Sequence, residues 1–176
     1  IGISNLNLSG LFTVRVNQFA DAISQTLPVT GTSETVVIDF SASETTSTAG
    51  EAYYEITADG LIIEAFEQSI MADLALRRVT LTHNGKTENA FFFGLSNLNA
   101  AFSDGSNVIL SLTNASGGLL VFSDGVAAKF DGQLDINVTD VSATGVYSLL
   151  LNTTGSAIDQ TFSIGGSNET LEVEAG

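Results

Sequence analysis

Four aspartates, each directly before a glycine, are the residues of this chain best placed to bind a metal ion. They are Asp59, Asp104, Asp124 and Asp131. Asp-Gly pairs favour tight turns, and turns gathered along one rim of a sheet bring their carboxylates together. Ca²⁺ takes about six to eight oxygen ligands, which carboxylates can supply. The chain has neither an EF-hand loop nor glycine-rich calcium-binding nonapeptides. The main expectation is therefore no cofactor, with Ca²⁺ at these turns as the alternative.

Groups that commonly carry out catalysis are scarce. The chain has one histidine, His83, and no cysteine, which excludes His-rich and thiolate metal sites. It has no Gly-x-Ser-x-Gly elbow, no Gly-x-Gly-x-x-Gly motif after a strand and no Walker-type loop. His83 stands beside an Asn-Gly pair, so we expect an exposed turn histidine. The sequence predicts no catalytic and no cofactor-binding residues, and hence no enzyme.

The charge balance narrows the possible partners. Among 176 residues, 20 are acidic and five are Lys or Arg, which gives a net charge of −15. A phosphate backbone or an anionic membrane surface would be repelled, so neither nucleic acid nor membrane insertion is expected. No apolar run approaches the roughly 18 residues that span a bilayer. No cleavable signal is visible at Ile1, so any secretion signal is expected to lie outside this sequence.

The elements that must position the acidic turns are β-strands. Phe12, Val14 and Val16 alternate with other residues at period two, which places them on one face of a sheet. Similar short apolar runs recur along the chain and predict roughly a dozen strands. Five dipeptides are typical of hairpin turns: Asp59-Gly60, Asn84-Gly85, Gly117-Gly118, Asp124-Gly125 and Asp131-Gly132. Pro28 predicts that its own strand is an edge strand.

One segment departs from this pattern. Residues 64–78 consist largely of good helix formers, and Phe66, Ile70 and Leu74 are spaced by four. The segment predicts either one short helix or a strand pair whose local propensity is overridden. The predicted fold is all-β, elongated and mostly antiparallel, a two-layer sandwich or open roll. A β-solenoid is the alternative.

The two ends of the chain are alike. Residues 10–39 and 145–174 align without a gap at an offset of 135, with nine identities in 30 positions, where composition alone gives about two. An internal repeat predicts the same backbone and facing in both copies, with poorer burial at one end. Gly31 and Gly166 are expected at equivalent turns with positive φ. Gln25 and Gln160 are expected to point inward.

The repeated stretch carries a resemblance. The pattern "SGxFxVxxN" followed by "AIxQT" in residues 3–40, with its variant "TGxYxLxxN" followed by "AIxQT" in residues 138–176, resembles the long tandem repeats of very large bacterial surface proteins of adhesin type. The "FEQ" at 66–68 and the stretch 112–134 resemble the middle of that repeat. The resemblance implies an extracellular, cell-surface stalk or spacer and offers no catalytic residues. The chain would then be a single β-rich unit over 1–176: one period, about 1–135, plus the start of the next, about 136–176. Its ends would be cuts through an array.

Two other functions fit the sequence. Tyr53 and Tyr54 place one ring on each face of a strand, and an exposed ring would suit a lectin-like module that binds glycan. Alternatively, because the first strands resemble the last, they could fill the equivalent slot in an identical subunit. Donor-strand exchange would then build a filament. The expected partners are therefore neighbouring repeats or identical subunits, and glycan under the second hypothesis.

Overall fold

The computed structural model describes residues 6–45, 52–65 and 68–176, and these form an all-β protein. Seven strands form the large sheet: β1 (Leu6–Asn17), β4 (Tyr53–Ala65), β5 (Gln68–His83), β6 (Lys86–Ser103), β7 (Val108–Val121), β8 (Val126–Val138) and β9 (Val141–Asn152). Two further pairs form separate hairpins: β2 (Ile23–Pro28) with β3 (Thr35–Phe40), and β10 (Ile158–Ile164) with β11 (Ser167–Val173). A 3₁₀ turn covers Ala42–Glu44.

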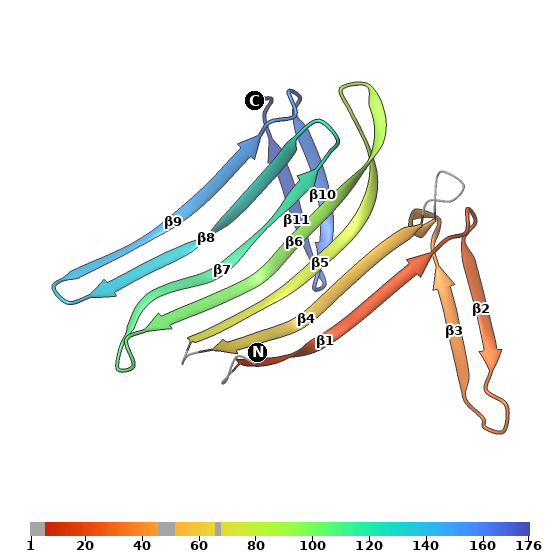
Figure 1. The fold of residues 1–176 in the computed structure, drawn as a ribbon, viewed down its shortest axis with the longest axis horizontal. Helices are drawn as coiled ribbons and strands as arrows, with labels where there is room; N and C mark the ends of the chain where they lie inside the picture. The colour runs from red at the N-terminus through yellow and green to blue at the C-terminus, as the bar shows by residue number, and fades with distance from the viewer. Residues whose placement is uncertain (1–5, 46–51, 66–67) are drawn as a thin grey trace.

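The large sheet is open and antiparallel throughout. Its strand order is β1-β4-β5-β6-β7-β8-β9, so β1 and β9 are its two edges (Figure 1). Successive strands are neighbours except where the β2–β3 hairpin is inserted between β1 and β4. The predicted all-β, mostly antiparallel fold is confirmed. The β-solenoid alternative is wrong, because the strands pair as a meander instead of coiling.

Residues 64–78 form no helix where the structure describes them. Residues 64 and 65 end β4, and residues 68–78 belong to β5, so the strand alternative is correct; Phe66 lies outside the described residues. β5 is paired on both sides, with β4 and with β6. Two ladders of backbone hydrogen bonds and burial on the sheet outweigh helix propensity, which amounts to a few tenths of a kcal/mol per residue.

Two of the five predicted turn dipeptides form turns. Asn84 and Gly85 connect β5 to β6 with φ of 50° and 69°, and Asp124-Gly125 lies between β7 and β8. The other three lie inside strands. Gly60, with φ of 58°, sits at an irregularity where the β4–β5 register shifts between Ala58 and Leu61. Similar shifts in β1, β5, β6 and β7 accompany the bend of the strands seen in Figure 1.

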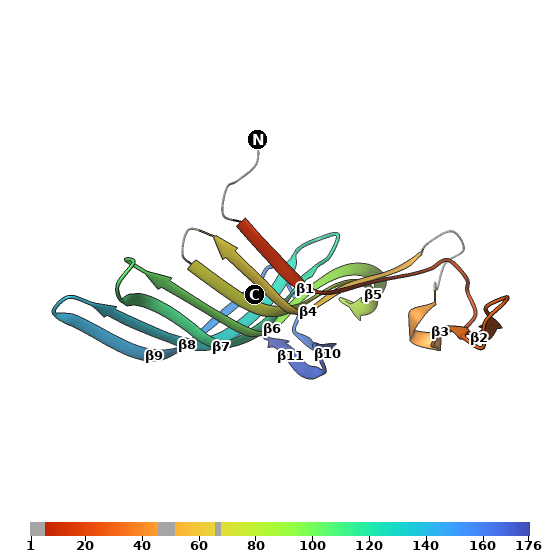
Figure 2. The same cartoon turned by 90° about the horizontal axis from the view of Figure 1, so that it is seen from below.

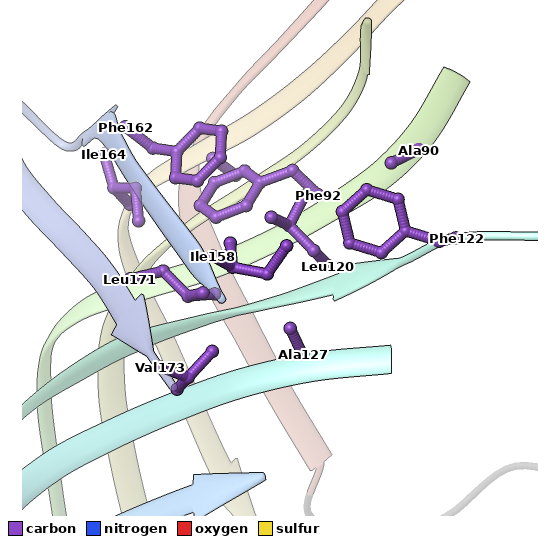
Figure 3. Close-up of a cluster of buried hydrophobic side chains, with 11 residues drawn as sticks. Ala90, Phe92, Leu120, Phe122, Ala127, Ile158, Phe162, Ile164, Leu171 and Val173 are labelled. Carbon is purple, nitrogen blue, oxygen red and sulfur yellow. The ribbon is translucent and has the colours of Figure 1, made fainter. Parts of the chain in front are cut away.

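The core lies between the large sheet and the β10–β11 hairpin. Figure 2 shows the hairpin as a second layer on one face of the sheet, where β10 contacts β5 and β6 and β11 contacts β7, β8 and β9. The buried side chains alternate along each strand, as a half-buried surface requires. The cluster, most of it labelled in Figure 3, consists of Ala75, Ala90, Phe92, Leu120, Phe122, Ala127, Ile158, Phe162, Ile164, Leu171 and Val173.

Candidate functional site

Residues 6–40 and 141–173 form the same series of elements at an offset of 135. β1 spans residues 6–17 and β9 spans residues 141–152, and each long strand is followed by a hairpin. Asn17 and Asn152 end the two strands in the same way. The side-chain oxygen of each accepts a hydrogen bond from the backbone N–H two residues on, at Phe19 and at Thr154. The identity of these asparagines therefore reflects a shared turn at the end of the long strand.

The two hairpins differ in their loops. Gly31 and Gly166 both have positive φ, 88° and 79°, as expected. β10 and β11 are joined by two residues, whereas a longer loop joins β2 and β3, with Pro28 paired to Thr35. The prediction that Gly31 and Gly166 lie in equivalent turns is therefore wrong. Ile23 pairs with Phe40, but Ile158 pairs with Val173, the counterpart of residue 38. This two-residue shift keeps every side chain on its original face, because strand side chains alternate with period two.

Burial separates the two hairpins sharply. Phe162 and Leu171 are 6% and 2% exposed, whereas their counterparts Leu27 and Val36 are 48% and 51% exposed. The same contrast holds at two further matched pairs, Val29 with Ile164 and Ile38 with Val173. β2 and β3 contact chiefly each other, and they lie beyond the β1 edge of the sheet in both Figure 1 and Figure 2. One copy is thus covered and the other is not. We call β10–β11 the docked hairpin and β2–β3 the uncovered hairpin.

The docked hairpin requires room above the sheet for its large apolar side chains. A Cβ at Gly94 would overlap Ile164 and the Phe92 ring, and a Cβ at Gly118 would overlap the same ring. The Phe92 ring lies between these glycines and stacks on Phe162 with centroids 3.7 Å apart. We call the edge of β8 that pairs with β9, together with this face of β5–β8, the acceptor surface. The glycines make it deep enough for large side chains.

Arg15 holds the uncovered hairpin at the β1 edge. Its guanidinium donates to the Asp39 carbonyl at 2.7 Å, lies 4.8 Å from the centre of the Phe40 ring and pairs with Glu44 at 2.6 Å. Burial raises the pKa of Glu44, but hydrogen bonds from Ser41 and Arg15 outweigh it and lower that pKa overall. These contacts fix the position of the end of the hairpin relative to β1, but they do not cover its apolar face.

His83 is buried, so the expectation of an exposed turn histidine is wrong. Its imidazole contacts Asp124 Oδ1 from Nε2 at 3.1 Å and Glu88 Oε1 from Nδ1 at 3.3 Å. The Phe122 ring covers it, with ring centroids 4.1 Å apart. The neighbouring Asn84 donates to the Thr154 carbonyl. Turns that are distant in sequence therefore meet here, and their packing removes the ring from solvent.

Glu88 is the most connected carboxylate of this corner. Ser123 donates to its Oε2, and so does the Lys86 ammonium at 2.9 Å. The Ser123 hydroxyl, followed by Lys86, lowers the pKa of Glu88 below its ordinary value. Of the residues described, only His83, Glu88 and Asp124 bring three potential ligand atoms together, within 4.8 Å of one another. A cation, Lys86, already neutralises one oxygen of Glu88, so the arrangement serves as an ion-paired cluster that ties turns together.

The predicted calcium ligands lie in different settings. Asp59 is part of the irregular stretch of β4, and Asp104 accepts backbone hydrogen bonds from Ser106 and Asn107 in the β6–β7 turn. Those bonds, Asn107 first, lower the pKa of Asp104. Asp131 lies inside β8 and pairs with Lys129 at 3.8 Å. Only Asp124 joins the cluster at His83, so within the described ranges the four aspartates do not converge on one site.

The feature of the sequence that indicated the docked and uncovered hairpins was the internal repeat of residues 10–39 and 145–174. Gln160 is half-buried at the edge of a hollow, while Gln25 is exposed, so the inward direction expected for both amides fails in the first copy. Tyr54 is exposed and Tyr53 half-buried, as their opposite facing predicted.

Comparison of the chain with protein-family models, with curated proteins and with solved structures gave no match. Within the parts of the chain that the structure describes, no helix is long and apolar enough to cross a membrane.

Proposed function

We propose that the chain is a structural stalk or spacer repeat of a large, adhesin-like bacterial cell-surface protein and performs no catalysis. One period would be residues 1–135, and residues 136–176 would begin the next. Each period would end where the long strand and hairpin of its successor cover it.

The observation that carries this proposal is the contrast between the two hairpins. Residues 141–173 cover the acceptor surface, and their counterparts 6–40 stand uncovered at the opposite edge of the sheet. If β9 is the β1 of a following period, the outer edge of β9 would receive the next β4, just as β1 pairs with β4 here. The large sheet would then continue from one period to the next as an uninterrupted ribbon.

The sheet geometry gives this ribbon a repeat length. From β1 to β9 there are six strand spacings, each of about 4.8 Å, so each period would add about 29 Å. A net charge of −15 per chain disfavours collapse of such a ribbon onto itself. The resemblance of the repeated stretch to bacterial surface repeats supports an extracellular location.

A longer chain in which residues 1–135 occur twice, followed by 136–176, tests the proposal. Small-angle X-ray scattering should show one continuous particle with a larger radius of gyration and maximum dimension than the present chain, as expected when about 29 Å is added across the strands. Two bodies on a flexible connection, or a compact doublet without elongation, would contradict the array.

A carbohydrate-binding module is the second candidate. A hollow of about 630 Å³ lies beside β10, and its lining includes Tyr53, Arg77, Asn89 and Gln160. An aromatic ring among polar side chains suits a sugar. A glycan array with the wild-type chain and with Tyr53→Ala tests this role. Specific binding that disappears in the variant would favour it over the stalk.

A further inference from the structure

We propose that residues 6–40 of one molecule dock on the acceptor surface of a second copy of the chain. β1 would pair with the partner's β8, and the uncovered hairpin would cover the partner's β5–β8 face. The partner's own β9, β10 and β11 would be displaced. This inference rests on the proposed repeat function and extends it from a covalent array to assembly between separate chains.

The apolar faces match on the first strand of each hairpin and are offset by two residues on the second. In the docked hairpin, Ile158, Phe162 and Ile164 fill the space beneath it. The uncovered hairpin presents Ile23, Leu27 and Val29 at the same places. On the second strand, Leu171 and Val173 pair with Gln160 and Ile158, whereas Ile38 and Phe40 pair with the counterparts Gln25 and Ile23. Ile38 and Phe40 would therefore take the places of Leu171 and Val173. All of these side chains are apolar, so the surface that accepts one hairpin can accept the other after local repacking.

The free edge of β1 fits the register of β8. In the present chain Tyr147 lies opposite Gly132 and its ring covers the place where a Cβ would stand. The counterpart of Tyr147 is Phe12, which is 52% exposed. The same register places Thr13 opposite Asp131, where Ser148 stands now. β1 pairs with β4 through its other edge, so docking adds a ladder and breaks none in the donor molecule.

One position in this register is unfavourable. Leu150 lies opposite Lys129 in the present chain, and its counterpart is Arg15. Arg15 would therefore face the Lys129 of the partner, and like charges directly opposite each other destabilise a strand pair. In addition, β9–β11 are tethered to their own sheet at high effective concentration. The folded wild-type chain accordingly keeps its own hairpin docked, and exchange requires either that this hairpin is weakened or that chains refold together at high concentration.

The first experiment weakens the docked hairpin in the full chain and measures mass by sedimentation velocity. In F162D/L171D the hairpin is undocked, and β9 is left with only its β8 ladder. This variant should form head-to-tail oligomers whose mass rises with concentration. The matched control adds L27D/V36D, the same changes in the uncovered hairpin, and should remain monomeric. Adding K129E to F162D/L171D should strengthen association, because a carboxylate then faces Arg15 of the next molecule.

Two results would overturn the proposal. A monomeric F162D/L171D that retains its strand content by circular dichroism means that residues 6–40 cannot fill the surface. Oligomers that persist in the four-substitution control mean that association does not use the uncovered hairpin.

A second experiment leaves both hairpins intact and covers the case in which F162D/L171D fails to fold. Two single-cysteine chains, T13C and D131C, are refolded together at high concentration and oxidised, and the wild-type chain contributes no thiol of its own. The pair should form a disulfide between chains, whereas T13C with N137C, six residues out of register, should not. No link in the matched pair, or equal links in both pairs, would refute the register. If the disulfide test fails while the two-period chain is elongated, exchange between chains is refuted and the stalk proposal is not affected.

Discussion

The ring of Phe162 in the docked hairpin stacks on the ring of Phe92 in the large sheet, with planes inclined by 17°. Leu27, the counterpart of Phe162, has no such partner surface and is 48% exposed. Truncation of the side chain should therefore cost far more stability at residue 162 than at residue 27.

Phe162→Ala should lower the free energy of unfolding by about 3 to 5 kcal/mol, the usual cost of deleting a buried aromatic side chain. Leu27→Ala should change it by about 0.5 kcal/mol or less, as expected at an exposed position. Urea denaturation of the two variants measures both values. Equal losses would mean that the uncovered hairpin is buried in solution.

Gly94→Ala should destabilise the protein by about 1 to 3 kcal/mol, because its methyl group overlaps Phe92 and Ile164 under the hairpin. Gly145 is the control, since a Cβ there meets no atom within 4 Å and its φ lies outside the region that disfavours other residues. Thermal unfolding of both alanine variants tests this, and a stable Gly94→Ala would refute tight docking of the hairpin.

Asn152→Ala should destabilise the chain more than an average polar substitution. The amide of Asn152 donates to the Ser156 and Glu174 carbonyls and its oxygen accepts from Thr154. Losing these bonds while their partners stay in place costs about 1 to 3 kcal/mol. Limited proteolysis is the measurement, and we expect cleavage to increase near 153–157. An unchanged cleavage pattern would argue against a structural role for this asparagine.

Stability should fall in acid in a way that depends on Glu88. The folded-state pKa of Glu88 is lowered, so its contribution is fully present above the ordinary carboxyl pKa of about 4.5 and is lost as pH falls through the lower folded value. Glu88→Gln should therefore be less stable than wild type at pH 6, with the difference shrinking towards pH 3. Melting temperatures across this range give the comparison. A difference independent of pH would assign the effect of the substitution to packing.

Added Ca²⁺ should leave the melting temperature unchanged. Among the described residues, Asp59, Asp104 and Asp131 belong to no group of three or more potential ligand residues, and Ca²⁺ needs several oxygens at one point. Differential scanning fluorimetry in millimolar Ca²⁺, with Mg²⁺ as the control, checks this. A rise of several degrees specific to Ca²⁺ would revive the turn aspartates as ligands.

Local chemistry determined a large part of the fold. Period-two alternation identifies strands from the sequence, because side chains in a strand point alternately to two faces whatever the neighbours are. Asn84-Gly85 forms a tight turn for an equally local reason, since positive φ suits both residues. Pro28 ends an edge strand, as its missing N–H predicts.

Other features depend on contacts that the sequence does not display. Gly60 permits positive φ, and only pairing with β5 decides that it bends a strand instead of ending one. Residues 68–78 favour a helix locally, but ladders on both sides hold them extended. His83 stands beside a turn dipeptide, which predicts exposure. It is buried because turns distant in sequence pack around it.

The candidate site shows the same division. The sequence determined that residues 10–39 and 145–174 carry similar side chains at matched positions. Both segments therefore form similar strands whose apolar side chains lie on the same face. Only the tertiary structure decided that one hairpin is docked and the other uncovered. An apolar face is buried when a complementary surface is within reach of its connecting strand. β9 lies beside β8 and the glycine-lined face of the sheet, whereas β1 lies at the opposite edge, where its hairpin reaches no such surface in the same molecule.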